Sequence, residues 1–303
     1  MTSIPTTLRA HEAISPATPP VPQKSVAQIL ENITHLAALP EVTRRVLNLV
    51  ENPKTTPHDL HEVISQDPAL VSRILKVANS AFYGLPGQVS SINRAIVMLG
   101  HTALVNIVVA ASMTKLFRGK QLGPYLNVKE LWRHSVAVGV FSEMIVSKIN
   151  PTLRDEAFLG GLIHDIGILV QLQAMRDPLA EMLERTAHEQ TRYVDLEARM
   201  LGIDHQALGA GLTELWNLPR NFKYVAGYHH QPLALAPECR WLTCVVHVAD
   251  QVCCSAGHGF ALTCHGEALN PAVLLELGIT PEALEDWSRR LPEALHEAEA
   301  LLG

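Results

Sequence analysis

The sequence predicts an all-α fold, and three observations lead to this expectation. Apolar residues recur at helical spacing from Ser25 onward, no run of alternating strand residues stands out, and capping residues stand where helices should begin and end. The 303 residues are 48% hydrophobic and 18% charged, which provides a sizeable core and excludes a disordered or collagen-like chain. A chain of this length is expected to form about two domains.

The first 24 residues lack this helical pattern. Thr, Ser and Pro dominate there, so we expect a disordered tail over residues 1–24. No basic start followed by an apolar stretch is visible, and the five cysteines contain no CxxC pair. The longest apolar runs, residues 103–113 and 161–170, are shorter than the roughly 20 residues of a membrane span. We therefore expect a cytoplasmic protein without a membrane partner.

Caps and apolar stripes predict the helices of the first half. Asp67 is a natural N-cap and Pro68 suits the first position of the helix that follows. Further along, Ser90 or Ser91 can cap a helix that Gly100 ends. Residues 103–117 are apolar almost all round and predict a central buried helix.

Gly and Pro residues at 118–127 mark a break between two helical halves. Beyond the break we expect helices near 128–149, 155–174, 178–188, 191–201, 205–216, 219–229, 237–256, 270–277 and 281–301. There are 24 basic against 30 acidic side chains, a net charge of −6. This balance argues against a nucleic-acid partner.

Potential metal ligands stand in largely apolar segments of the second half. They are His134, His164, Asp165, His205, His229, His230 and Asp250. Burying such groups unpaired costs several kcal/mol each, so they need partners. Either a shared metal ion or a mutual hydrogen-bond network would satisfy them. Imidazole and carboxylate ligands suit Fe, Mn, Zn or Ni.

The order H…HD…H…HH…D resembles that of the HD-superfamily metal-dependent phosphohydrolases. Upstream, ALPEVTRRVLNLVENP, ISQDPALVSRILKVANSAFYG and SSINRAIVMLG resemble the HDOD domain of bacterial signalling proteins, over roughly residues 28–256. This resemblance implies a multi-helix bundle of two parts. An N-terminal helical subdomain over 25–118 would pack on an HD-like helical subdomain over 124–303, which includes the C-terminal helices.

The resemblance also implies roles for the ligand series. His134, His164, Asp165 and Asp250 would form the core metal site. His205, His229 and His230 would complete the shell of a second ion, with Asp165 bridging. We therefore expect one or two divalent transition-metal ions, and Asp165 is the candidate catalytic residue. Two departures argue against the cyclic-di-GMP-cleaving branch: Ile168 replaces a Lys, and HHQPLALAPECRW lacks that branch's Gly-Tyr-Pro loop.

Two functions follow from this pattern. The leading interpretation is an HDOD-type regulatory module that acts through signalling proteins. The alternative is an active phosphohydrolase or phosphodiesterase, which would take a nucleotide or another phosphate-containing small molecule. Cations that could meet a phosphate are Arg133, Arg154, Arg220 and Lys223.

Two further features of the second half are predicted to be structural. His247 lies three residues before Asp250 and so shares a helix face with it. We expect a satisfied core histidine there rather than support for the ligand. Cys253 and Cys254 are expected to be buried apolar filler.

Overall fold

The computed structural model describes residues 25–33, 39–52, 54–79, 85, 87–114, 116–117, 121–189 and 191–302. The tail expected over residues 1–24 lies outside these ranges. Within them the chain is helical, and its one β pairing is an isolated bridge between Leu122 and Leu126. The predicted all-α fold is therefore confirmed.

Fifteen α-helices and three short 3-10 helices make up the described chain. The first half holds α1 (Val26–Glu31), α2 (Glu41–Glu51), α3 (Pro57–Ile64), α4 (Pro68–Ala78) and α5 (Ile92–Met113). The second half begins with α6 (Val128–Ile149), η1 (Pro151–Leu153), α7 (Arg154–Ile163), α8 (Ile166–Ala174), α9 (Arg176–His188) and α10 (Tyr193–Met200). It continues with α11 (His205–Leu215), α12 (Arg220–Tyr228), η2 (Pro232–Ala234), α13 (Pro237–Ser255), η3 (Leu262–Cys264), α14 (Pro271–Leu277) and α15 (Pro281–Leu302).

The predicted caps of the first half are present. Asp67 accepts a hydrogen bond from the Leu70 backbone at 3.0 Å, and Ser91 caps α5. Gly100 leaves the helical conformation with φ 82° and ψ 175°, as its predicted role as a stop requires. The chain resumes the helix immediately, and residues 103–113 are buried as expected. The expected extension to residue 117 is wrong, because α5 ends at Met113.

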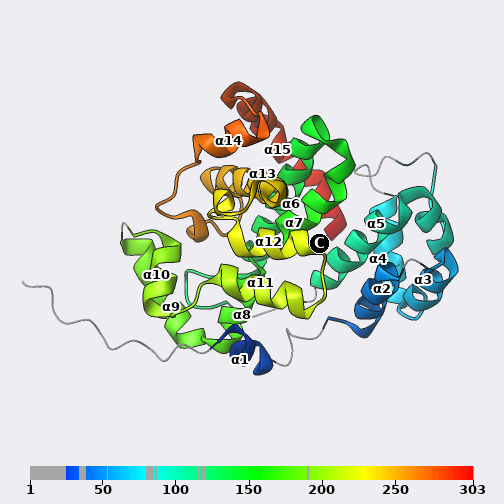
Figure 1. Cartoon of the computed structure of the whole chain (residues 1–303), viewed down its shortest axis with the longest axis horizontal. Helices are drawn as coiled ribbons and strands as arrows, with labels where there is room; N and C mark the ends of the chain where they lie inside the picture. Colours follow the sequence, from blue (N-terminus) through cyan, green and yellow to red (C-terminus); the bar gives the residue numbers. More distant parts are fainter. Residues whose placement is uncertain are drawn as a thin grey trace, which may run out of the picture.

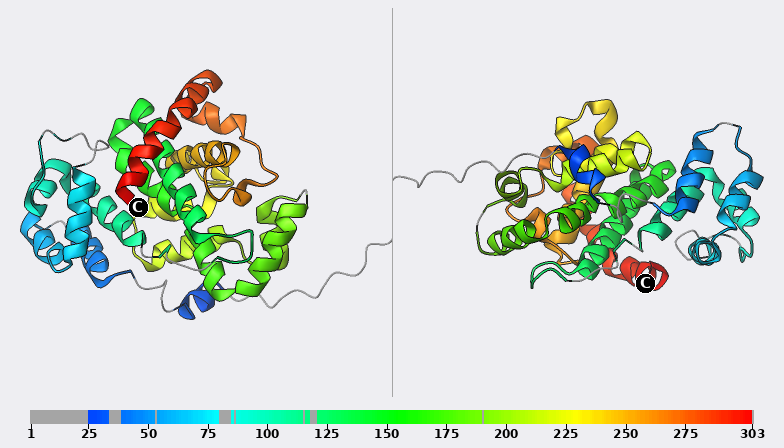
Figure 2. Two further views of the ribbon diagram at one scale, coloured as in Figure 1. Left: turned by 180° about the vertical axis from the view of Figure 1, so that it is seen from behind. Right: turned by 90° about the horizontal axis from the view of Figure 1, so that it is seen from below.

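The helices form two groups in space (Figure 1). Helices α2–α5 lie together at one side, and α5 packs on α7 of the second group. Helix α1 stands apart from α2–α5 and packs on α11, and the further views agree (Figure 2). Gly211 permits this contact, because a Cβ at that position would overlap the side chain of Val26.

Helices α6, α7 and α13 form the centre of the second group. Helices α6 and α7 approach each other closely, because a Cβ on Gly161 would lie 2.5 Å from the Cα of Gly139. Helix α13 packs on α6, α7 and α12, and α11 packs on α8 and α12. This arrangement brings parts of α6, α11, α12 and α13 around the junction between α7 and α8.

One predicted helix, over residues 155–174, is in fact two. The chain turns at His164 and Asp165, and Asp165 has φ −95° and ψ 13° at the start of α8. The turn redirects α8 so that Gly167 lies against the first residue of α11. A Cβ on Gly167 would overlap the carbonyl oxygen of His205, so only glycine permits this approach. The apolar run hid this break because both halves of it are core.

In the described part of the chain, two helical stretches are long and apolar enough to cross a membrane, namely Ile92–Met113 and Pro151–Ala174. Length and composition alone are weak evidence, and 67% and 78% of their most apolar windows are buried inside the fold. Such burial is what the core helices of a soluble protein show.

Candidate metal centre

The seven predicted ligands come together in one buried centre. His134 lies within α6, Asp250 within α13, and His205 is the first residue of α11. The pairs His164–Asp165 and His229–His230 stand at helix ends, after α7 and after α12. Each side chain is almost completely inaccessible: that of His230 is 2% exposed, and the other six are buried at 0–1%.

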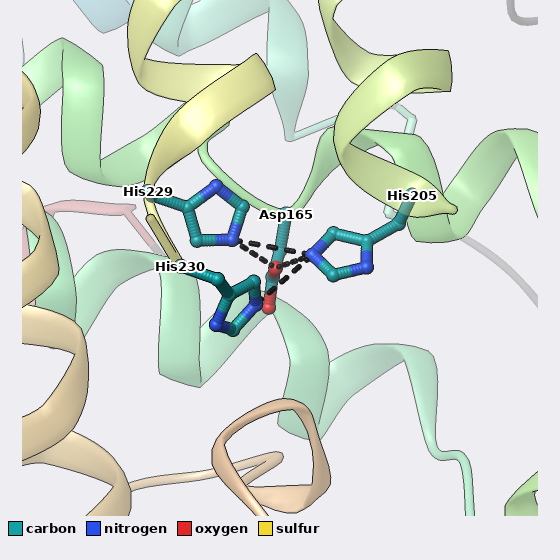
Figure 3. A group of neighbouring side chains, drawn as sticks. All are labelled: Asp165, His205, His229 and His230. Atoms are coloured by element: carbon teal, nitrogen blue, oxygen red, sulfur yellow. Dashed lines mark hydrogen bonds and ion pairs between the residues drawn. The ribbon is translucent and has the colours of Figure 1, made fainter. Parts of the chain in front are cut away.

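Asp165 stands between two sets of imidazoles. Its Oδ1 lies 3.4 Å from both His205 Nε2 and His229 Nε2 (Figure 3). Its Oδ2 lies 3.3 Å from His164 Nε2 and 4.0 Å from His134 Nε2. One carboxylate therefore serves two adjacent sites.

The distances in the first set match ligands on a single ion. His205 Nε2 lies 3.2 Å from His229 Nε2 and 3.2 Å from His230 Nε2. Two ligands about 2.1 Å from one metal lie about 3.0 Å apart at a right angle and about 3.4 Å apart at the tetrahedral angle. The spacings of His205 Nε2 and Asp165 Oδ1 to their neighbours in this set, 3.2 and 3.4 Å, fall in that range, and all four ligand atoms lie within 4.8 Å of one another.

The second set is slightly more open. Asp250 Oδ1 lies 3.0 Å from His134 Nε2 and 3.7 Å from His164 Nε2. Together with Asp165 Oδ2 these groups supply two nitrogens and two carboxylates. Cys254 Sγ lies 3.4 Å from Asp250 Oδ1 and belongs to the same cluster of candidate ligand atoms.

The outward nitrogen of every imidazole has an acceptor. Because carbonyl and carboxylate oxygens only accept, each Nδ1 donates, and Nε2 of each ring faces the centre. Figure 3 shows this orientation for three of the rings. The five contacts are His134 to the His258 carbonyl at 3.1 Å, His164 to Gly161 at 2.7 Å, His229 to Val225 at 3.2 Å, His205 to Glu197 at 2.7 Å, and His230 to Glu267 at 3.0 Å.

Three of the inward atoms lack hydrogen-bonding partners. Among the described residues, both oxygens of Asp165 and Nε2 of His164 are buried without a hydrogen bond. Leaving a buried carboxylate unsatisfied is costly, so the cluster requires positive charge at its middle. A donor set of imidazole nitrogens and carboxylate oxygens fits divalent transition metals.

The pKa values of the ion-free cluster likewise favour positive charge at its middle. Burial opposes a charge on His164, but Asp165 outweighs it and raises the pKa of His164 to about 9. Burial likewise opposes a charge on His205, yet Glu197 and then Asp165 raise its pKa to about 9. Burial also opposes the charge of Asp165, but His164 holds the pKa of that carboxyl well below its usual range. Protons on two imidazoles thus take the place that metal ions would fill.

The pKa values of two other imidazoles, His229 and His230, shift in the opposite direction. Burial lowers the pKa of His229 to about 3, with His230 adding to the effect. Burial and His205 lower the pKa of His230 to about 3. Both rings are therefore neutral and free to act as ligands at neutral pH.

Sequence reasoning missed the residues that orient the ligands. Glu197 is fully buried and accepts from both the ring and the backbone N–H of His205. No sequence signal marks it, because Glu197 stands in a short amphipathic stretch where an acidic residue is ordinarily exposed. Cys264 Sγ donates to Asp250 Oδ2 at 3.2 Å. Cys253 is buried as expected, whereas Cys254 is only half-buried and donates to Asp250, so the filler prediction is wrong for Cys254.

His247 is buried, and its ring also contacts the backbone of a candidate ligand. Its Nδ1 donates to the backbone carbonyl of His229 at 2.7 Å, which steadies a ligand-bearing turn. Its Nε2 has no hydrogen-bond partner among the described residues, so the expected satisfied core histidine is only half satisfied.

The cations proposed for phosphate binding are engaged outside the centre. Arg133 pairs with Glu130, Arg154 with Glu143, and Lys223 with Glu214. Arg220 lies over the ring of Tyr224, 5.3 Å from its centroid. We find no cation among these four in contact with the seven candidate ligands.

The fold and the site together define an all-helical protein of the HD type, with paired His and Asp residues around a shared carboxylate. The HDOD domain model matches residues 36–232, so the chain belongs to the HDOD domain family. The matched range ends before α13, which carries Asp250.

Individual proteins are also similar to this chain. An uncharacterized protein of Treponema pallidum (strain Nichols) is 27% identical over 216 residues, which cover 71% of this chain and 41% of that protein. The chain thus spans less than half the length of that relative. A Marinobacter aquaeolei VT8 structure described as a signal transduction protein matches with TM-score 0.70 and 23% identity, covering 93% of this chain and 61% of that one. A Shewanella amazonensis SB2B structure described as a phosphohydrolase matches with TM-score 0.69 and 21% identity, covering 92% and 98%. At these identities the structures establish the fold alone.

Proposed function

We propose that this protein is a cytoplasmic regulatory HDOD module whose His/Asp centre binds two divalent transition-metal ions. One observation carries the proposal: each oxygen of Asp165 is buried, unpartnered and faced by its own set of imidazoles. His205, His229 and His230 would hold one ion with Oδ1. His134, His164 and Asp250 would hold the other with Oδ2.

Burial favours regulation over turnover. The seven side chains are at most 2% exposed, so a phosphate ester reaches the centre only if the fold opens. Closed sites are typical of structural metals, whereas catalytic sites keep an open position. We infer that the metals hold the ends of α7, α11 and α12 against α6 and α13 in one arrangement, which signalling proteins recognise.

A metal-dependent phosphohydrolase is the second candidate, and the complete ligand set favours it. When bound, a pair of divalent ions supplies Lewis-acid stabilisation for charge on a phosphate ester. In that case Asp165 would fix the two sites at a constant separation. Glu197 would hold His205 in the required tautomer.

Metal stoichiometry tests the proposal. Protein purified without chelator should contain two transition-metal ions per chain by elemental analysis. Asp165→Asn should lose both ions, His230→Ala only one, and Asp250→Asn only the other. His58→Ala, at an exposed position of α3, is the matched control and should keep both. Protein that binds no Fe(II), Mn or Zn would overturn the proposal.

Turnover decides between the two candidates. Metal-loaded protein should leave phosphomonoesters, nucleotides and cyclic dinucleotides unchanged if the centre is regulatory. Hydrolysis that is abolished in Asp165→Asn would instead establish the phosphohydrolase. A partner search with loaded and metal-free protein should recover signalling proteins that bind only one of the two forms. Equal recovery by both forms would contradict a regulatory role for the metal.

A further inference from the structure

The first helix covers one face of α11. Helix α1 lies beside α11 and away from α2–α5 (Figures 1 and 2), and α11 is its main contact among the described elements. Gly211 lies in this contact, since a Cβ on it would overlap Val26 and would lie 3.1 Å from the Leu30 side chain. The HDOD domain model matches from residue 36 onward, so α1 is an addition to the matched domain.

The segment that carries α1 has the pattern of a helix that binds in a groove. Apolar residues recur at the i, i+3, i+4, i+7 spacing typical of such helices, namely Val26, Ile29, Leu30 and Ile33. The last three are at most 7% exposed and Val26 is half-buried, whereas residues 27, 28, 31 and 32 between them are exposed. Because a helix this short is marginal in water, α1 is stable only while it is docked.

The apolar face of α11 continues beyond α1. Leu215 stands four residues after Gly211, on the same side of the helix, and is 54% exposed. A helix that covers both residues would bury more apolar surface than α1 does. The α1 of a second copy would cover no more than the chain's own α1, so an exchange between two copies brings no gain.

We propose that this face of α11, at Gly211 and Leu215, is a docking site for an amphipathic helix of a signalling partner, and that α1 occupies the site in the free chain. The partner helix has the apolar spacing of α1 and at least one further turn, which covers Leu215. It displaces α1, because both helices need the space beside Gly211. This inference names the kind of partner that the regulatory module takes, and to that extent it rests on the proposed function.

A helical peptide tests the site directly. The probe is residues 25–33 with a hydrocarbon staple between the exposed positions 27 and 31, and fluorescence anisotropy follows its binding. In the parent chain α1 competes from within the molecule, at an effective concentration on the order of millimolar. Leu30→Asp releases α1, so this variant should bind the peptide at least about tenfold more tightly than the parent chain does. Ala27→Asp, at an exposed position of α1, is the matched control and should bind like the parent chain.

A second substitution blocks the site itself. In the Leu30→Asp chain, Gly211→Leu fills the space that Val26 otherwise takes and should abolish peptide binding. With α1 released this position faces solvent, where leucine favours a helix more than glycine does, so the fold is kept. Equal binding by the parent chain and Leu30→Asp, binding that survives Gly211→Leu, or no binding to any of these chains would overturn the proposal.

Longer peptides test displacement of α1. Two further stapled peptides carry one added turn with a leucine, at the N-terminal end in one and at the C-terminal end in the other. One of them should bind the parent chain at least about fivefold more tightly than the 25–33 peptide, because it also covers Leu215. Leu215→Asp should remove that gain.

Two results would contradict a partner helix. If neither longer peptide binds more tightly than the 25–33 peptide, the site does not extend to Leu215 and the proposal fails. A concentration-dependent dimer of the parent chain that Leu30→Asp dissociates would assign the face to a second copy and would equally overturn the proposal.

The link between this face and the metal centre has a separate test and rests on the proposed metal binding. His205 begins α11 six residues before Gly211, so an ion bound to His205 orders the helix that carries the face. Mn(II) should therefore raise the peptide affinity of Leu30→Asp about twofold or more. Unchanged affinity with Mn(II) bound would overturn this link. If Mn(II) does not bind at all, the metal proposal fails, while peptide titrations of the metal-free protein still decide the docking site.

Discussion

His205 Nδ1 donates to Glu197 Oε2 at 2.7 Å, and both side chains are fully buried. Glu197 Oε1 accepts two further hydrogen bonds, from the His205 backbone at 3.1 Å and from Gln171 Nε2 at 2.6 Å. Through this one carboxylate α8, α10 and the start of α11 are tied together. The ring of His205 consequently has one tautomer and one orientation, with Nε2 toward Asp165.

We expect Glu197→Gln to weaken one of the two proposed metal sites selectively. A glutamine offers one acceptor oxygen where the carboxylate offers two, so it cannot satisfy all three donors. Loss of such an outer contact typically lowers metal affinity about 10–100-fold. Competitive metal titration should show this loss for one ion only. Glu189→Gln, a partly exposed residue that pairs with Arg199, is the control and should bind both ions normally.

The sequence predicted the helices far better than the contacts between them. The helix expected near 128–149 is α6, Val128–Ile149, because its apolar positions are local information. The turn at His164 and Asp165 was missed, since an apolar run on both sides looks like one helix. Glu197 was missed because its partner, His205, belongs to another helix, and only tertiary packing makes an acidic residue of α10 a buried one. The candidate ligands were visible in the sequence because polar groups in apolar segments need partners.

Alanine substitutions at the adjacent Gly160 and Gly161 of α7 should have different effects on the free energy of unfolding. A Cβ on Gly161 would lie 2.5 Å from the backbone of Gly139, so Gly161→Ala must separate α6 from α7. We expect a loss of about 1–3 kcal/mol in the free energy of unfolding. Gly160→Ala places its methyl 3.4 Å from Val246, an ordinary contact, and should be neutral or stabilising by up to about 1 kcal/mol. Denaturant unfolding of both variants measures the difference, and equal effects would refute the close approach.

Cys244 should resist thiol reagents while the protein is folded. Burial, and then the charge of Glu276, raises the pKa of this thiol from 9.0 to about 11. At pH 8 only about one molecule in a thousand carries the reactive thiolate. Mass spectrometry after brief alkylation should find the partly exposed Cys239 labelled and Cys244 intact. Rapid native labelling of Cys244 at pH 8 would contradict this.

The same shift of Cys244 gives a dependence of stability on pH. The unfolded chain releases this proton near pH 9 and the folded chain near pH 11. The folded state therefore holds the proton more tightly, and its stability should fall as the pH rises through this window. Cys244→Ser removes the titrating thiol and should therefore remove this part of the pH dependence. Unfolding curves recorded across the window measure the difference.

Gly100 should resist substitution for a reason that is purely conformational. Its φ of 82° and ψ of 175° lie outside the regions that other residues adopt readily, yet a Cβ there would meet no atom within 4 Å. Gly100→Ala therefore adds no clash, and its expected cost of about 1–3 kcal/mol is backbone strain alone. His101→Ala, at the exposed neighbouring position, should be nearly neutral. If Gly100→Ala unfolds at the same denaturant concentration as the parent chain, the turn inside α5 does not depend on glycine.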